Sequence, residues 1–208
     1  MLGRDPVVVE LEHVGAYLED QVVLVTGAGG SIGSELCRQI ALVNPKLLVM
    51  VDHAEDNLFQ IEREMISERH FNRVEAVLAD CKETERMFEI MQRFRPSVVF
   101  HAAAYKHVPL MEANPLEAIR NTAIATRITA ETAAAATVER FVLISTDKAV
   151  LPQTVMGASK ALAEWAVTAA GESYPDTCYV SVRFGNVLGS SGSVVPIFRR
   201  QIEQGGPV

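Results

Sequence analysis

The feature that most restricts the fold is a regular alternation of short, continuously apolar segments with segments of helical periodicity. The apolar segments lie at residues 22–26, 47–52, 74–80, 97–104, 141–146 and 178–186. Helical patterns lie between them, at residues 31–43, 57–70, 82–94, 115–136 and 155–171. Strands without polar alternation are typical of a parallel sheet that helices cover on both faces. The sequence therefore predicts an α/β fold with a Rossmann-like, doubly wound parallel sheet.

A glycine-rich turn follows the first apolar segment, in the sequence VTGAGGSIGSEL. Glycines at this place permit a tight turn and let a pyrophosphate approach the backbone at the N-terminus of the next helix. An ordinary flexible turn between a strand and a helix is the alternative. Because the flanking pattern is that of a strand and a helix, we predict a dinucleotide site that includes Gly27, Gly30, Ser31, Ile32 and Gly33.

Acidic residues end the next two apolar segments. Asp52 lies 19 residues after Gly33, where a carboxylate accepts hydrogen bonds from an adenosine ribose and repels a 2′-phosphate. This favours NAD over NADP as the cofactor. Asp80 and Cys81 end the third segment, where we expect the adenine, although Asp80 could instead cap the following helix.

Small residues follow the fourth apolar segment. Ala102, Ala103 and Ala104 would let a nucleotide lie against the backbone. Close packing of a helix on the sheet needs the same small residues, so the sequence leaves both interpretations open.

Composition and charge exclude several classes of function. The net charge of -7 argues against a general affinity for nucleic acids or anionic membranes. The three cysteines have neither metal-binding spacing nor the pattern of a disulfide framework, so we expect no metal site and a reducing, cytoplasmic environment. No apolar run approaches the 18 residues or so of a membrane span, and no signal peptide opens the chain.

The organisation along the chain predicts one domain. Residues 1–20 resemble a lead-in segment that is extended over residues 4–12, and residues 21–208 form the NAD-binding domain with the start of a substrate-binding part. The chain ends in a Gly-Gly-Pro turn and a valine, like a strand that is beginning. We expect a fragment of a longer protein.

Five motifs, which run from about Thr26 to the last residues, carry a resemblance to a known family. They are TGAGGSIGSEL, DHAEDNLFQIE, HAAAYKHVPLMEANPLEAIRNT, STDKAVLPQTVMGASK and SVRFGNVLGSSGSVVPIF. Together they resemble the extended short-chain dehydrogenases that modify nucleotide sugars. The closer resemblance is to the UDP-N-acetylglucosamine 4,6-dehydratases of bacterial polysaccharide and glycan biosynthesis.

The resemblance implies a setting for the domain. Large members of the family carry an N-terminal membrane portion, which implies a cytoplasmic domain of an inner-membrane protein, without direct membrane contact of its own. In the family a C-terminal region closes over the UDP-sugar, and that region would lie beyond Val208. We therefore expect this fragment to bind NAD without turning over substrate. The helices at residues 115–136 and 155–171 commonly pair between subunits, which implies a homo-oligomer.

The acid-base chemistry is expected at Thr146, Asp147 and Lys148. Sugar dehydratases generally have a Thr-Asp-Glu triplet here, with the aspartate as acid and the glutamate as base. The resemblance therefore implies that Lys148 is the base at C5, for which it must be uncharged. In the alternative interpretation Asp147 caps the next segment and Lys148 is a solvated surface residue.

The segment VMGASK departs from the usual Tyr-x-x-x-Lys pattern, since Met156 lies four residues before Lys160. Methionine neither gives nor takes a proton, so Met156 is expected to be an apolar wall. In the family the lysine holds the nicotinamide ribose, whereas the alternative is a solvent-facing helix lysine. The C4 hydroxyl proton is assigned to Asp147, directly or through water, with Thr146 and Tyr105 as alternatives.

Further residues are expected around the substrate. Tyr105, Lys106 and His107 should border the sugar, although His107 could be a structural loop histidine. Asn186, Arg183 and the loop at residues 190–193 resemble the part that meets the uridine diphosphate, although Arg183 could be a buried ion-pair arginine.

Two other functions remain open. A UDP-hexose 4-epimerase shares the C4 oxidation but has no C6 elimination, and therefore does not need an acid-base pair after Thr146. A non-catalytic NAD-binding regulatory module would explain the missing tyrosine as lost catalysis. The mass of the product from UDP-N-acetylglucosamine distinguishes these three functions.

Overall fold

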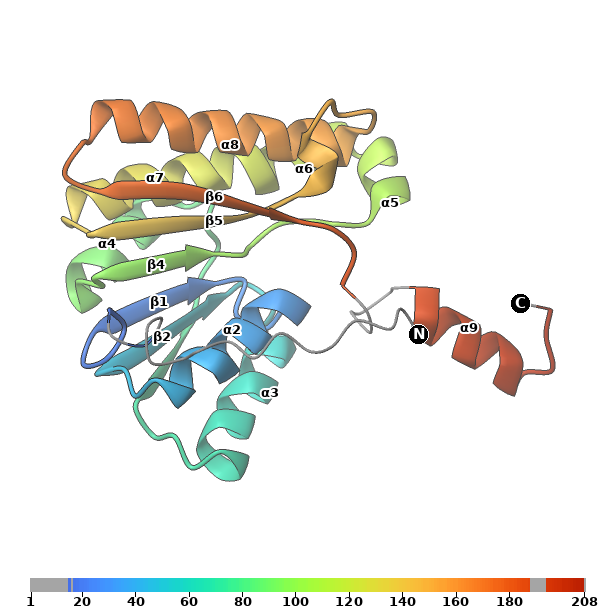
Figure 1. The fold of residues 1–208 in the computed structure, drawn as a ribbon, viewed down its shortest axis with the longest axis horizontal. Coiled ribbons are helices and arrows are strands. Elements are labelled where there is room, and N and C mark those ends of the chain that lie inside the picture. Colours follow the sequence, from blue (N-terminus) through green and yellow to red (C-terminus); the bar gives the residue numbers. More distant parts are fainter. Residues whose placement is uncertain (1–14, 16, 188–193, 208) are drawn as a thin grey trace.

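The computed structural model describes residues 15, 17–187 and 194–207. Its strands form one 6-stranded parallel sheet in the order β3-β2-β1-β4-β5-β6 (Figure 1). The strands are β1 (Val22–Thr26), β2 (Leu47–Asp52), β3 (Val74–Leu78), β4 (Val98–His101), β5 (Arg140–Thr146) and β6 (Cys178–Phe184). The predicted α/β fold with a doubly wound sheet is confirmed, and the strand order reverses between β1 and β4.

Helices connect the strands. They are α2 (Ser31–Leu42), α3 (Glu55–Arg63), α4 (Thr84–Phe94), α5 (Val108–Ala113), α6 (Pro115–Ala118), α7 (Ala125–Ala135), α8 (Val155–Ser173) and α9 (Val194–Glu203). Two π-helical turns, η1 (Glu64–Glu68) and η2 (Ile119–Ile124), and one 3-10 turn, η3 (Asp147–Ala149), complete the path. The helix predicted at residues 115–136 is therefore α6, η2 and α7 in succession, and neither α5 nor α9 was predicted.

Three predicted strands are shorter than expected. The third strand ends at Leu78 rather than at residue 80, the fourth at His101 rather than at residue 104, and the sixth at Phe184 rather than at residue 186. In each case, residues that directly follow the strand line a cavity. The extended segment predicted at residues 4–12 and the loop at residues 190–193 lie outside the described residues.

Alternate strand residues enter two apolar cores. Leu24 of β1 packs in a core with Phe141 of β5 and with residues of α4, α7 and α8. Val23 and Val25, its neighbours in β1, pack on the other face with residues of α2 and α3. A strand that is buried on both faces has no polar alternation, which explains the continuous apolar runs in the sequence.

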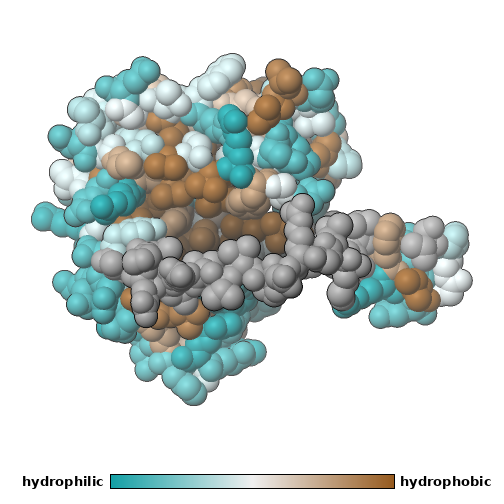
Figure 2. Space-filling model, in the orientation of Figure 1, coloured by the Kyte–Doolittle hydropathy of each residue, from teal (hydrophilic) through white to brown (hydrophobic). Residues whose placement is uncertain are grey.

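The described residues leave one face of the sheet partly uncovered at its β6 edge. Val180 and Val182 are 44% and 43% exposed, and Figure 2 shows a hydrophobic area over β5 and β6. These side chains alternate with Tyr179, which reaches α7 on the opposite face, where its hydroxyl donates to the Ala130 carbonyl. The prediction that helices cover both faces is therefore wrong for this part of the described chain, since α2 and α3 lie over the other half of the sheet (Figure 1).

A buried histidine joins β1, β4 and α7. The Thr126 hydroxyl donates to the Thr122 carbonyl at 2.6 Å, so the proton between His101 Nε2 and Thr126, 3.0 Å apart, comes from the histidine. His101 Nδ1 then accepts from the Thr26 hydroxyl at 2.7 Å. Burial, with a smaller effect of the Lys160 charge, lowers the pKa of His101 to about 3. The imidazole is therefore neutral, with its proton on Nε2.

This network predicts acid sensitivity that depends on His101. The unfolded chain binds a proton at about pH 6.5 and the folded chain only near pH 3, so acid favours unfolding between these values. From pH 7 to pH 5 the contribution to the free energy of unfolding falls by about 2 kcal/mol. Urea denaturation of wild type and His101→Asn at both pH values should show a smaller loss in the variant.

The matched control is His70→Asn, since His70 is an exposed histidine with a positive φ that asparagine tolerates. Its pH dependence should equal that of the wild type. Equal losses in wild type and His101→Asn would contradict the neutral state assigned to His101.

Candidate functional site

The glycine turn after β1 is packed too closely for any side chain. Gly27 has a φ of +66°, and a Cβ there would lie 2.6 Å from the Ala103 nitrogen and 2.7 Å from its Cα. A Cβ on Gly33 would lie 1.9 Å from the Gly27 carbonyl oxygen. The first contact brings the ends of β1 and β4 together, and the second seats α2 against the turn.

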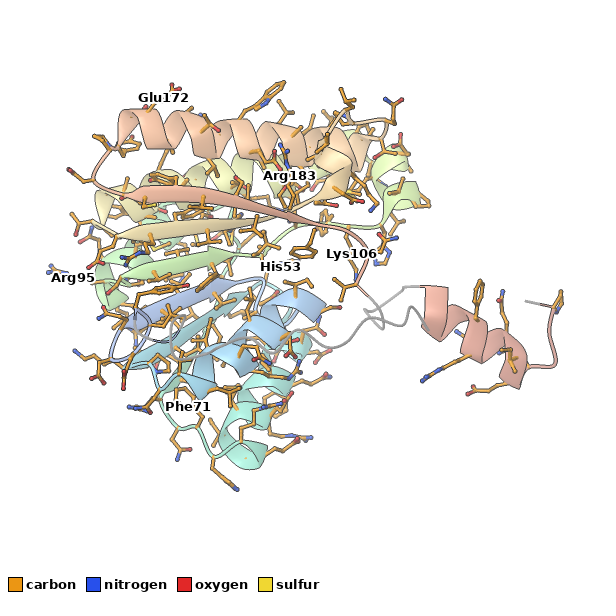
Figure 3. All side chains as sticks on the ribbon, in the orientation of Figure 1. His53, Phe71, Arg95, Lys106, Glu172 and Arg183 are labelled. Carbon is orange, nitrogen blue, oxygen red and sulfur yellow. The ribbon has the colours of Figure 1, made fainter. Side chains whose placement is uncertain are left out.

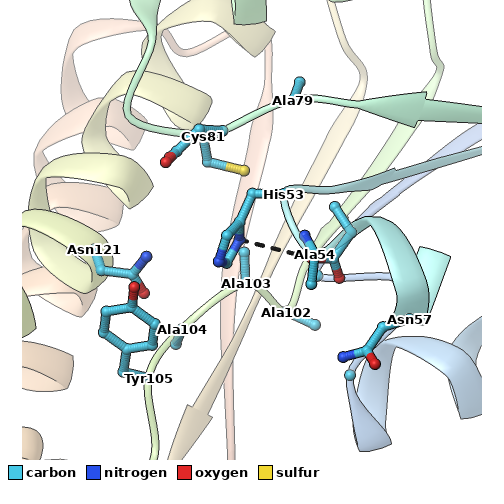
Figure 4. Close-up of a pocket in the computed structure, with 14 residues that line it drawn as sticks. His53, Ala54, Asn57, Ala79, Cys81, Ala102, Ala103, Ala104, Tyr105 and Asn121 are labelled. Atoms are coloured by element: carbon cyan, nitrogen blue, oxygen red, sulfur yellow. Dashed lines mark hydrogen bonds and ion pairs between the residues drawn. The ribbon is translucent and has the colours of Figure 1, made fainter.

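A cavity of about 280 Å³ opens beside this turn, at the carboxyl ends of β1, β2, β3 and β4 (Figure 4). Ligands of doubly wound sheets bind at this edge, where the strand order reverses. The cavity is lined by Gly27, Gly30, Asp52, His53, Ala54, Asn57, Ala79, Asp80, Cys81, Ala102, Ala103, Ala104, Tyr105 and Asn121. It therefore brings together most of the residues that were predicted to bind the cofactor.

Four of the predicted cofactor residues are not part of the cavity lining. Ser31, Ile32 and Gly33 open α2, and Lys160 lies in α8. Ile32 lines a second cavity, of about 340 Å³, with other residues of α2 and with residues 184–187 after β6. The two cavities thus lie on either side of the glycine turn.

Asp52 is the buried carboxylate of the first cavity. Its Oδ2 accepts a hydrogen bond from the Gly29 backbone nitrogen at 2.9 Å, and its Oδ1 accepts from the Ala54 nitrogen at 2.9 Å. Each carboxylate oxygen can accept a further hydrogen bond. Asp52 therefore fixes the glycine turn and retains capacity to bind the hydroxyl groups of a ribose.

Asp80 lies in the turn between β3 and α4 and does not cap the helix, since the N-cap of α4 is Glu83, without a side-chain hydrogen bond. Asp80 Oδ1 accepts from the Lys82 backbone nitrogen at 2.9 Å, and its Oδ2 lies 3.2 Å from the Lys82 ammonium. Asp80 thus orders the turn before α4 and also lines the cavity. Burial raises the pKa of the neighbouring Cys81 to about 12, so this thiol is a neutral wall of the cavity.

Residues 102–107 divide into two groups. Ala102, Ala103 and Ala104 line the cavity and also pack closely, because the Ala102 nitrogen donates to the Thr26 carbonyl at 3.1 Å. Tyr105 lines the same cavity, whereas Lys106 and His107 are exposed before α5, at the carboxyl end of the sheet (Figure 3).

Asn121 is a residue of this cavity that the sequence analysis missed. It lies in the π-helical turn η2, is 7% exposed and faces the same space as Tyr105 (Figure 4). The signal available in the sequence was a single amide side chain within a helix that is otherwise rich in alanine and threonine.

A second cluster lies at the ends of β5 and β6. The Asp147 carboxylate accepts hydrogen bonds from the Thr146 hydroxyl and from the Lys148 ammonium, both at 2.9 Å. The Lys148 ammonium also donates to Asn186 Oδ1 at 2.9 Å. The structure thus brings four of the predicted site residues into direct contact.

The charge state of Asp147 follows from these contacts. The hydrogen bond from Lys148, and then that from Thr146, lower the pKa of the Asp147 carboxyl. Without substrate, the Asp147 carboxyl is therefore an anion.

Helix α8 places Lys160 and Met156 on its buried face. The Thr154 hydroxyl caps the helix by accepting from the Gly157 nitrogen at 3.1 Å. Lys160 is 7% exposed and its ammonium donates to the Ile144 carbonyl at 2.8 Å, so the solvent-facing alternative is wrong. Burial lowers the pKa of Lys160 to about 8, and the Glu164 carboxylate partly offsets this effect.

Met156 is 5% exposed and packs against Met111 and Ala118, with Tyr105 at the edge of the same apolar cluster. Its side chain fills space between α8 and the helices α5 and α6. The prediction of an apolar wall agrees with this position.

Arg183 forms an ion pair with a carboxylate that the sequence analysis missed. Its Nε lies 2.9 Å from Glu164 Oε1, and its second terminal nitrogen lies 2.6 Å from Oε2. The Ser145 hydroxyl also donates to Glu164. Arg183 is half exposed and reaches from β6 toward α8 (Figure 3), so the ion-pair interpretation describes its contacts here.

The described residues contain neither a metal-binding group nor a membrane-spanning helix. Within the described part of the chain, no group of three or more His, Cys, Asp or Glu residues is arranged to hold a metal ion. Among the described helices, none combines the length and the apolar run that crossing a bilayer requires.

Comparison with known proteins gives relatives of the chain. The capsular polysaccharide biosynthesis protein CapD of Staphylococcus aureus is 50% identical over 100% of this chain, and the probable polysaccharide biosynthesis protein EpsC of Bacillus subtilis is 48% identical. The chain spans 35% of the length of each of these relatives. A UDP-N-acetylglucosamine 4,6-dehydratase (inverting) of Campylobacter jejuni is 34% identical over 88% of the chain and 54% of that protein.

Solved structures share the fold. The structure of Pen from Bacillus thuringiensis superposes with a TM-score of 0.85 and 33% identity, over 90% of this chain and 59% of that chain. The dTDP-glucose 4,6-dehydratase DesIV of Streptomyces venezuelae has a TM-score of 0.77 at 21% identity, over 90% and 63% of the two chains. The second likeness is one of fold alone.

The sequence profile of a family described as polysaccharide biosynthesis protein matches residues 23–208. This match covers almost the whole sheet and both clusters of site residues. It confirms the resemblance found in the motifs of the sequence. The chain belongs to the polysaccharide biosynthesis protein family, with the fold of the extended short-chain dehydrogenases.

Proposed function

We propose that the protein is a NAD-dependent nucleotide-sugar 4,6-dehydratase that acts on UDP-N-acetylglucosamine. The observation that carries the proposal is the acid-base pair at the end of β5, where Asp147 and Lys148 lie 2.9 Å apart. The relative of the same named activity in Campylobacter jejuni, at 34% identity, supports the choice of reaction and sugar.

The residues of the first cavity fit a dinucleotide. Gly27 and Gly30 line the cavity without side chains, which leaves the backbone of the turn open to a pyrophosphate, and Asp52 lines the same space as a ribose acceptor. We assign the pyrophosphate to the glycine turn, the adenosine to the side of Asp52 and Asp80, and the nicotinamide ribose to Lys160. NAD, when bound, supplies the acceptor that removes hydride from C4 and returns it to C6.

Asp147 can manage two proton transfers with one carboxylate. As an anion it accepts the proton of the C4 hydroxyl while C4 is oxidised, and it then gives that proton to the C6 hydroxyl, which leaves as water. The proton balance closes without a tyrosine, because the proton released at C4 is the one consumed at C6. The lowered pKa of the Asp147 carboxyl supports its anionic state before the first step.

Lys148 is the proposed base for the C5 proton and later returns that proton to C5. In the substrate-free structure its ammonium is stabilised by the Asp147 carboxylate. The C5 proton becomes acidic only when C4 is a ketone, so oxidation at C4 precedes proton removal at C5.

Tyr105, Lys106, His107 and Arg183 remain predicted substrate contacts.

The oligomeric state and the cellular location of the protein are also proposals. Exposed apolar side chains on α8, with Trp165 at 68% and Leu162 at 38%, support a homo-oligomer formed through this helix. An archaeal relative that is 41% identical is named an uncharacterized membrane protein, which supports a cytoplasmic domain of a membrane-linked protein.

The second candidate is a UDP-hexose 4-epimerase. UDP-glucose 4-epimerases of Rickettsia species are 32% identical to the chain, and this likeness makes epimerisation the second candidate reaction. The longest natural form of the protein and this chain should both be incubated with NAD and UDP-N-acetylglucosamine. Loss of one water from the sugar supports dehydration, unchanged mass with inverted C4 supports epimerisation, and NAD binding without turnover in either chain supports a regulatory module.

The role of Asp52 predicts a change in cofactor preference. Asp52→Asn keeps the shape of the side chain and removes the charge that repels a 2′-phosphate. NAD binding should weaken by about 1–3 kcal/mol, the size of a charge-assisted hydrogen bond, and NADP binding should weaken less. Calorimetry with both cofactors measures the ratio.

The ratio of NAD affinity to NADP affinity distinguishes cofactor recognition by Asp52 from a role in ordering the glycine turn. If Asp52 only orders the turn, its substitution weakens the binding of both cofactors equally. Asp56→Asn, an exposed carboxylate in the first turn of α3, is the control and should leave both affinities unchanged. An unchanged ratio in Asp52→Asn would show that the residue only orders the backbone.

The proton assignments predict a ranking of activities. Met156→Leu should keep activity within about tenfold, roughly 1.4 kcal/mol of barrier, since Met156 only fills space. Asp147→Asn should lose about 100- to 10,000-fold, the usual effect of removing a positioned acid or base. Lys148→Met should also stop exchange of the C5 hydrogen with deuterated solvent.

Turnover and solvent exchange with UDP-N-acetylglucosamine measure this ranking. Met156→Leu serves as the packing control for the two charged residues. If Met156→Leu lost as much activity as Asp147→Asn, the assignment of Met156 as an apolar side chain that only fills space would be refuted. Abolished C4 oxidation in Tyr105→Phe would move the C4 proton from Asp147 to Tyr105.

A further inference from the structure

The side chain of Asn186 has a partner that its expected role does not explain. Asn186 was predicted to contact uridine diphosphate, yet its Oδ1 accepts a hydrogen bond from the Lys148 ammonium at 2.9 Å. The two residues come from the ends of neighbouring strands, because Thr146 of β5 pairs with Phe184 of β6. The contact therefore joins two segments that each lie just beyond the sheet.

The backbone that follows β6 lies close to the Asp147 side chain. A Cβ on Gly185 would lie 3.7 Å from Asp147 Oδ2, which is ordinary van der Waals contact. The segment after β6 therefore runs directly beside the Asp147 carboxylate. Asn186, one residue further on, is placed to reach the amine of Lys148.

The two acceptors of the Lys148 ammonium differ in charge. Asp147 Oδ1 and Asn186 Oδ1 both lie 2.9 Å from its nitrogen. Two acceptors restrict the direction of a flexible lysine side chain, which is otherwise 38% exposed. Because the amide is neutral, it restrains the amine without adding a second negative charge that would hold its proton.

The restraint from Asn186 also survives the proposed proton transfer. When Asp147 accepts the C4 proton it loses its charge and holds Lys148 less tightly, whereas the Asn186 amide oxygen is unchanged. The amide then remains as the acceptor that keeps Lys148 in place when it acts at C5.

We propose that Asn186 is a positioning residue for Lys148, which it holds through its amide oxygen at the junction of β5 and β6. The expected effect of Asn186 on the reaction rate rests on the proposed dehydratase function. The contact itself is independent of that function. It differs from a role in binding uridine diphosphate, which needs no acceptor directed at a lysine.

The kinetic test uses Asn186→Ala in the longest natural form of the protein. Loss of positioning should lower kcat and the rate of C5 hydrogen exchange, on the order of 100-fold, because small misplacements of a reacting group have effects of this size. KM for UDP-N-acetylglucosamine should change by less than about threefold, since the variant keeps the binding loops. A raised KM with an unchanged kcat would instead identify a substrate-binding residue and overturn the proposal.

A second measurement does not depend on activity. Acetic anhydride in limiting amount, followed by mass spectrometry of peptides, reports how accessible the Lys148 amine is. Asn186→Ala should increase the acetylation of Lys148 several-fold, and Asn186→Asp, which restores an acceptor, should return it to the wild-type level or below. Lys46, an exposed lysine remote from the cluster in sequence, is the control within each sample and should react equally in all three proteins.

The two measurements separate the proposals. If no nucleotide sugar is turned over but acetylation of Lys148 follows this pattern, the proposed function fails and the contact stands. If acetylation of Lys148 in Asn186→Ala equals that of the wild type, the positioning role is refuted whatever the enzyme does.

Discussion

The site depends on the close approach of two backbone segments, at Gly27 and Ala103. A Cβ on Gly27 would lie 2.6 Å from the Ala103 nitrogen, so only glycine allows β1 and β4 to end side by side. The Thr26 carbonyl and the buried His101 bridge hold the same strand ends together. Because the strand order reverses between β1 and β4, this contact forms the floor of the cavity at the carboxyl edge of the sheet. The placement of Asp52 and Asp80 around this cavity follows from it.

The loss of a tyrosine is compatible with catalysis because the charged groups lie on a different element. Met156 packs in an apolar cluster on α8, whereas Asp147 and Lys148 follow β5 and face solvent. Lys160, one turn after Met156, is buried and held by the Ile144 carbonyl. A hydroxyl at position 156 would therefore enter apolar packing in this structure. The carboxylate, ammonium and amide at the β5–β6 junction restrain one another, and the proposed acid-base function is assigned to this junction.

The sequence predicted what depends on local pattern and missed what depends on pairing across the fold. Continuous apolar runs and glycine spacing identify the strands and the turn at Gly27, because these are properties of short segments. The position of Asn121 depends on a π-helical turn, which has no clear local signature. Glu164 looks like an ordinary helix residue until β6 places Arg183 beside it. The exposed edge at Val182 shows the same limit, since cover depends on which helices reach that strand.

The ion pair of Arg183 and Glu164 explains how α8 is held in register with the sheet. Glu164, Lys160 and Met156 are spaced at four-residue intervals and therefore share one face of the helix. The Glu164 side chain is 9% exposed, whereas the Arg183 side chain that pairs with it is 50% exposed. In this structure Arg183 therefore ties β6 to α8, the helix that also carries Lys160.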